Sequence, residues 1–150
     1  MDDANLRESV RQWMEIADGD LRSAEALLDL EPPELRAAAF HCQQAGEKYL
    51  KALLVLHGQD PPYTHDLKLL VTGASVIDAS LSSLATDAAS LTPYGTGTRY
   101  PRPTRVPSPD EVRDLLQAAR RIRDAVRPLL PDPNEPAEEA GSTDTEPPDA

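Results

Sequence analysis

Residues 33–57 read PELRAAAFHCQQAGEKYLKALLVLH and predict one long helix. Pro33 suits the first turn of a helix, and Gly58 is a typical C-terminal stop. At about 1.5 Å per residue, this helix would be about 37 Å long. When its residues are projected at about 100° each, one narrow apolar arc emerges, typical of a core stripe. That arc contains Ala38, Cys42, Ala45, Tyr49, Ala52 and Leu56.

The apolar surface of this helix is wider than one buried face requires. Leu50 and Leu54 lie well round the helix from the core stripe, with Leu53 and Gly46 between them. One interpretation is a helix between its own bundle and a second copy of the chain, each extra buried leucine contributing about 1.5–3 kcal/mol. The dimer interface would then contain Ala39, Gly46, Leu50 and Leu54. The alternative, a central helix of a monomeric bundle, fits the same periodicity.

Apolar spacing is helical nearly everywhere else, and no alternating run indicates a strand. Further helices are predicted over residues 5–29, 65–71 and 79–91. The last helix begins at the capping box Ser108-Pro109-Asp110-Glu111. We therefore expect an all-α fold, an antiparallel up-and-down bundle of four main helices plus a short one. The first helix should bury Leu6, Val10, Trp13, Ala17, Leu21, Ala24 and Leu28.

The 150 residues suit one domain, and their charge is uneven. Lys and Arg number 15 and Asp and Glu 26, a net charge of −11, which argues against a general nucleic-acid binder. Seven of the acids and none of the bases lie in residues 131–150, so the rest carries 19 acids against 15 bases. We predict a helical domain over residues 1–130 and a disordered acidic tail over residues 131–150.

The expected setting is the cytoplasm. Cys42 is the single cysteine, so no internal disulfide can form. The acidic start at Met1 indicates no signal peptide, and no apolar run is long enough for a membrane span. Three scattered histidines without a supporting ligand pattern predict no metal site, and no motif indicates a cofactor.

A restricted polar strip accompanies the apolar surface of the helix over residues 33–57. Its Glu47 and Lys51 have the spacing of a surface ion pair, which contributes only about 0.2–0.5 kcal/mol. The functional interpretation is a groove with an imidazole, an amide and two ammonium groups, which can hold a phosphate or a nucleotide. The strip contains His41, Gln44, Glu47, Lys48 and Lys51.

Arginines gather near the C-terminal end: eight of the fifteen bases lie between Arg99 and Arg127, with four acids. One interpretation is a solvated helix face with pairs such as Arg120–Asp124. The other is a surface for phosphate, RNA or an acidic partner.

Residues 40–54, FHCQQAGEKYLKALL, resemble the signature helix of HEPN domains, the higher eukaryotes and prokaryotes nucleotide-binding family. The shared pattern is aromatic-His-x-x-Gln-Ala-x-Glu-Lys-x-Leu-Lys-Ala. Other pieces agree in the same order, and together they cover about residues 10–130. These pieces are Trp13, Ala17, Asp20, Leu21 and Ala24, then Thr64-His65-Asp66-Leu67, then Tyr94, Arg99, Tyr100 and Pro101.

The resemblance implies a helical bundle that forms a homodimer and acts with a small nucleotidyltransferase-type protein, often as a toxin–antitoxin pair. Many family members are metal-independent ribonucleases with Arg-x4–6-His at the start of a late helix. This sequence departs there, because no histidine follows Arg99. Arg36 and His41 match the spacing, but in the wrong helix.

We therefore expect a nucleotide or a nucleic-acid phosphate, RNA included, to bind the polar strip. The segments that contain His65 and Arg99-Tyr100 should contribute to the same site. Two alternatives stay open: a metal-independent ribonuclease toxin, with Arg99 stabilising charge and His41 or His65 as base, and a non-catalytic dimeric interaction module. The expected ligand-binding residues are His41, Gln44, Glu47, Lys48, Lys51, His65, Arg99 and Tyr100.

Overall fold

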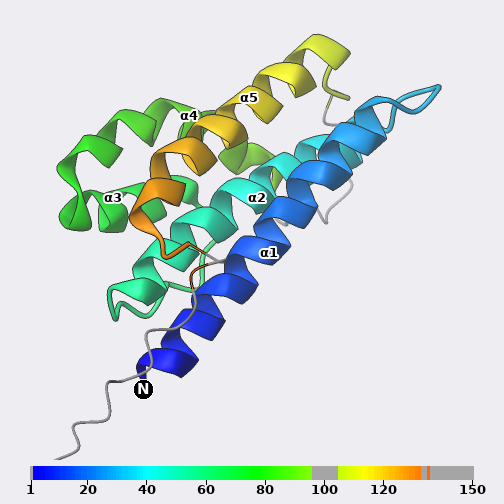
Figure 1. Cartoon of the computed structure of the whole chain (residues 1–150). Coiled ribbons are helices and arrows are strands. Elements are labelled where there is room, and N and C mark those ends of the chain that lie inside the picture. Colours follow the sequence, from blue (N-terminus) through cyan, green and yellow to red (C-terminus); the bar gives the residue numbers. More distant parts are fainter. Residues whose placement is uncertain (1, 96–104, 133–134, 136–150) are drawn as a thin grey trace, which may run out of the picture.

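The computed structural model describes residues 2–95, 105–132 and 135, and within them every regular element is helical (Figure 1). None of these helices combines the length and apolar character that a membrane span needs. The α-helices are α1 (Asp3–Leu28), α2 (Leu35–Leu56), α3 (Leu67–Ile77), α4 (Ala85–Leu91) and α5 (Pro109–Val126). Short 3₁₀ helices cover Ala79–Leu84, Thr92–Tyr94 and Arg127–Leu129.

Helices α1 and α2 lie side by side in opposite directions, and α5 packs on α2 (Figure 1). The buried stripe of α1 keeps Val10, Ala17, Leu21 and Ala24 of the predicted one, but Met14 is buried where Trp13 was expected. Trp13 packs against the edge of the core, and Leu6 and Leu28 are also only partly buried. Met14 lies next to Trp13 on the same side of α1 and takes the core position between Val10 and Ala17.

Helix α2 is the centre of the molecule, with 13 of its 22 residues buried. Gly46 shows how closely its neighbours approach: a Cβ there would lie 3.0 Å from Leu67, 3.2 Å from Leu91 and 3.2 Å from Ile122. These residues belong to α3, α4 and α5. The chain therefore covers the second apolar side of α2 with its own C-terminal half.

The predicted dimer interface is wrong. Leu50 is 0% exposed, Leu54 is 2% exposed, and Ala39 and Gly46 are also buried within one chain. A residue already enclosed by its own fold has no surface left for a second copy. The alternative interpretation, in which α2 is the central helix of a single chain, accounts for the wide apolar arc.

Helix boundaries follow local signals. Ser108 caps α5 as predicted, its Oγ accepting a hydrogen bond from the Glu111 backbone N–H at 3.1 Å. Asp66 caps α3 by accepting from the Lys68 N–H, so α3 begins two residues later than predicted and continues to Ile77. The helix predicted over residues 79–91 is divided into a 3₁₀ helix and α4. Most of the predicted tail, residues 131–150, lies outside the described residues.

Candidate functional site

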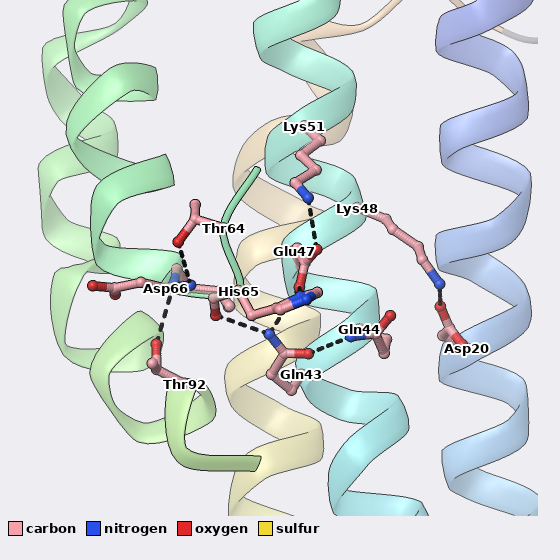
Figure 2. A network of polar contacts seen from close by, with 11 residues as sticks. Asp20, Gln43, Gln44, Glu47, Lys48, Lys51, Thr64, His65, Asp66 and Thr92 are labelled. Atoms are coloured by element: carbon pink, nitrogen blue, oxygen red, sulfur yellow. Dashed lines mark hydrogen bonds and ion pairs between the residues drawn. The ribbon is translucent and has the colours of Figure 1, made fainter. Parts of the chain in front are cut away.

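The structure brings six of the predicted site residues to one region of α2. Five of them project from α2, and His65 comes from the segment that leads into α3. Figure 2 labels all of these residues except His41. We use the name polar strip for His41, Gln44, Glu47, Lys48, Lys51 and His65. Arg99 and Tyr100, the other two predicted residues, lie outside the described part of the chain.

The first half of the polar strip meets Asp20 of α1. The Lys48 Nζ donates to Asp20 Oδ2 at 2.6 Å, and His41 Nδ1 lies 2.8 Å from Asp20 Oδ1. Because an ionised carboxylate only accepts, the hydrogen of that contact lies on His41 Nδ1. Asp20 is buried, whereas the His41 side chain is 30% exposed. We call Asp20, His41 and Lys48 the Asp20 cluster.

The second half is organised by Glu47, which points the other way from α2 (Figure 2). The Lys51 Nζ donates to Glu47 Oε1 at 2.7 Å, while His65 Nδ1 lies 3.0 Å from Oε2. Gln43 donates its Nε2 to the same Oε2 at 3.0 Å and to the His65 carbonyl at 3.1 Å. We call Gln43, Glu47, Lys51 and His65 the Glu47 cluster.

Glu47 is ionised despite its burial. Burial alone would raise the pKa of its carboxyl, but the hydrogen bonds from Lys51, His65 and Gln43 outweigh that cost and hold the pKa below its usual range. A carboxylate that stays charged can orient the His65 ring across the physiological pH range.

Both clusters follow the same design. In each, one oxygen of a buried carboxylate binds a lysine and the other binds the Nδ1 of a partly exposed histidine. Each lysine is therefore neutralised within the chain. The expected groove with two available ammonium groups is not what the fold provides, because both lysines are held by carboxylates. The Nε2 atoms of His41 and His65 have no hydrogen bond within the described residues.

Two residues of these clusters were missed by sequence reasoning. Gln43 lies four residues before Glu47, so helical spacing could have indicated it. Asp20 lies on a different helix, and no local spacing relates it to His41 or Lys48. Gln44 was predicted and is partly exposed, with its Nε2 donating to Gln43 Oε1 at 2.7 Å.

The chain passes close to the Glu47 cluster just before residues 96–104. A Cβ on Gly95 would lie 3.1 Å from Gln43 Nε2 and 3.4 Å from His65 Cβ. The absence of a side chain at Gly95 therefore allows the backbone to lie against the cluster. Arg99 follows four residues later in the sequence.

The arginines of α5 and the turn after it bind acids of their own chain. Arg120 donates to Glu25 of α1 at 2.8 Å, rather than to Asp124 as predicted. Glu25 of α1 competes with Asp124 of α5 for the Arg120 guanidinium. Asp124 binds Arg123 instead. Arg121 and Arg127 likewise bind Asp87 and Asp18. These pairs favour the interpretation of a helix face with ion pairs over a free polyanion surface.

A cavity of about 200 Å³ lies elsewhere, between the first turns of α1 and the residues Pro131, Asp132 and Glu135. Its lining includes Val10 and Met14 but no residue of either cluster. The polar strip lies outside this cavity.

Comparisons with known proteins agree with the sequence pattern. The family model described as HEPN domain matches residues 10–129. The chain is also similar to the protein in the crystal structure of TT1696 from Thermus thermophilus, with 28% sequence identity and a TM-score of 0.66. That similarity covers 81% of this chain and 98% of the other. A search of the curated proteins found no match.

Proposed function

The chain belongs to the HEPN domain family, and from this premise we propose that it binds a nucleotide or a nucleic-acid phosphate at the polar strip. The observation that supports the proposal is the pair of oriented imidazoles. His41 and His65 each have Nδ1 on a buried carboxylate and a ring that is 30% or 41% exposed. A carboxylate that holds Nδ1–H fixes the ring and leaves Nε2 available for a ligand.

Anion binding at this strip requires protonated histidines. Asp20 and Glu47 are balanced by Lys48 and Lys51, so the strip is neutral while both imidazoles are neutral. In the protonated ring, Nε2–H donates to a phosphate oxygen while Nδ1–H still donates to the carboxylate.

The test is calorimetric titration with AMP of the native chain and two conservative variants, His41→Gln and His65→Gln. The glutamine amide can still donate to the carboxylate, so the fold is kept while the second ring nitrogen is lost. We expect each variant to weaken AMP binding by about tenfold, the loss of a charged hydrogen bond. His57→Gln, at the exposed end of α2, is the matched control and should bind normally. Unchanged affinity in both test variants would contradict the proposal.

We extend the proposed site to Arg99 and Tyr100, because the chain that leads to them passes the Glu47 cluster at Gly95. An arginine would bind phosphate and a tyrosine could stack on a base. The variant Arg99→Ala should weaken AMP binding, with circular dichroism to confirm that it folds. If AMP binding stays intact in that variant, this part of the site is wrong.

Family membership also supports a partner. We propose a cytoplasmic homodimer that acts with a nucleotidyltransferase-type protein as a toxin–antitoxin pair. The dimer would use outer surfaces, since the four residues first assigned to it are buried. A nucleotidyltransferase reading frame next to this one, whose product relieves growth arrest caused by this chain, is the expected result. No arrest and no such neighbour would contradict the pairing.

A second candidate function is metal-independent cleavage of RNA. The observation in its favour is that an imidazole oriented by a carboxylate can accept a proton from a 2′-hydroxyl group through Nε2. Cleavage of RNA in EDTA, lost in His41→Gln or His65→Gln, would support it. Complete absence of cleavage in the native chain would exclude it.

A further inference from the structure

Tyr63 is the most exposed large hydrophobic residue of the described part of the chain, with a relative exposure of 100%. It is the central residue of a three-residue turn in which the Thr64 N–H donates to the Pro62 carbonyl at 2.8 Å. No described residue other than glycine has a positive φ, so this is the common inverse form of the γ-turn. The turn directs the ring away from the fold, and no packing of the core depends on it.

The turn itself is held in place. The Asp66 N–H donates to Thr64 Oγ1 at 3.0 Å, and Gln43 of α2 holds the His65 carbonyl at 3.1 Å. The His65 ring is fixed on Glu47 at 3.0 Å. An exposed aromatic ring on a fixed backbone loses little conformational freedom when it binds a flat ligand, which favours stacking.

Tyr63 and His65 stand next to one another. Their ring centroids lie 6.2 Å apart, and the rings are inclined at 62°. The Tyr63 ring therefore lies close to the His65 ring, whose Nε2 the proposed function assigns to phosphate. A ligand with an aromatic base and a nearby phosphate can meet both rings at once.

We propose that Tyr63 is a stacking platform for a nucleobase, so that the ligand of the Glu47 cluster is a nucleotide with an unpaired base. This inference rests on the proposed function and names its ligand class: a mononucleotide or the single-stranded end of a nucleic acid. A base inside a duplex is excluded, because both of its faces are already stacked on neighbouring bases. Base stacking on an aromatic side chain contributes enough to change affinity by about 5- to 150-fold.

The test compares AMP with ribose 5-phosphate, which carries the phosphate but no base. Tyr63→Ala should weaken AMP binding by about 5- to 150-fold and leave ribose 5-phosphate binding unchanged. Tyr63→Phe should retain most of the AMP affinity, because it keeps the ring. Leu69→Ala, an exposed apolar position on α3, is the control and should not change either affinity.

The outcomes separate this inference from the proposed function. If Tyr63→Ala binds AMP as the native chain does, the stacking role is wrong while phosphate binding at the strip stands. An equal loss for AMP and ribose 5-phosphate would show that Tyr63 acts only through His65, and would also overturn it. If the native chain binds neither compound, the proposed function fails and this inference with it.

A third comparison identifies the source of the base. A short single-stranded oligonucleotide that binds more tightly than AMP would indicate a nucleic-acid end, and tighter binding of AMP would indicate a mononucleotide. Both results support a stacked, unpaired base. Equal affinity for a blunt duplex and its single strand would contradict it.

Discussion

Glu47 binds three partners through one carboxylate and connects α2 with the segment before α3. It holds Lys51 on its own helix, His65 in the loop before α3, and the buried amide of Gln43. Burying an ionised carboxylate is costly unless such donors replace the lost water. The site therefore depends on a complete set of hydrogen-bond partners. Among the described residues, no buried side-chain nitrogen or oxygen lacks such a partner.

Replacing Glu47 by glutamine should destabilise the protein strongly. The variant leaves the Lys51 ammonium, only 9% exposed, without its counter-charge. Loss of one member of a buried ion pair costs about 3–5 kcal/mol, so the free energy of unfolding should fall by about that amount in urea denaturation at pH 7. Glu15→Gln is the control: its side chain is 68% exposed, and we expect a change below about 0.5 kcal/mol.

The contribution of Glu47 should also depend on pH. Its pKa in the folded protein is lowered, so the unfolded state binds the proton more readily. The stabilisation is therefore complete above the ordinary carboxyl pKa and is lost as the pH falls through the lowered value. Denaturation between pH 7 and pH 3 should show the native chain and Glu47→Gln converging at acid pH. A constant difference over that range would show that Glu47 is not the titrating group.

At the scale of the elements, two helical glycines have opposite surroundings. A Cβ on Gly19 of α1 would meet only Arg22, at 3.8 Å, whereas one on Gly46 of α2 would press on three side chains at 3.0–3.2 Å. The same substitution should therefore have opposite effects in the two helices.

Gly19→Ala should raise the free energy of unfolding by about 0.5–1 kcal/mol, because alanine has the better helix propensity. Gly46→Ala should lower it by about 1 kcal/mol, since overpacking of a dense core costs about 1–3 kcal/mol and exceeds that gain. Thermal denaturation of both variants provides the measurement. Stabilisation by Gly46→Ala would show that the packing of α2 against α3, α4 and α5 is looser than described.

Sequence reasoning succeeded for elements with local signals. The capping box at Ser108 and the apolar period of residues 33–57 depend on neighbours in the chain, and both predictions are confirmed within two residues. Sequence reasoning failed where contacts between distant segments determine which residues are buried or paired. The burial of Met14 in place of Trp13 depends on packing partners that no local spacing reveals, and so does the pairing of Arg120 with Glu25.

The candidate site shows the same limit. The family pattern indicated the polar residues of α2, but Asp20, which orients His41 and binds Lys48, lies 21 and 28 residues away from them. Periodicity could not show that each lysine is neutralised. The sequence predicted a groove with two available lysines, whereas the fold provides two imidazoles oriented by carboxylates. Only the tertiary structure shows this difference.

At the scale of the whole molecule, α2 is enclosed by the helices of its own chain. Leu54 illustrates this, because it is 2% exposed and a Cβ on Gly73 of α3 would lie 3.3 Å from it. Leu54→Ala should lower the free energy of unfolding by about 2–5 kcal/mol, as expected for a core leucine. Val76→Ala, at a position 80% exposed, should have little effect.

Sedimentation distinguishes a core leucine from an interface leucine. Under native conditions, the sedimentation coefficient of Leu54→Ala should equal that of the native chain, whether the native chain is a monomer or a dimer. If Leu54→Ala dissociated an assembly and left the denaturant concentration at the unfolding midpoint unchanged, Leu54 would belong to an interface between copies.

The central claim is that His41 and His65 each contact a phosphate group of a nucleotide or a nucleic acid, and nuclear magnetic resonance of the histidine rings tests it most directly. The chain has three histidines, and the exposed His57 at the end of α2 serves as an internal control. On titration with AMP at pH 6, we predict that the ring signals of His41 and His65 shift in a saturable manner while those of His57 do not. Three unmoved sets of signals, or a shift of equal size at His57, would contradict the account.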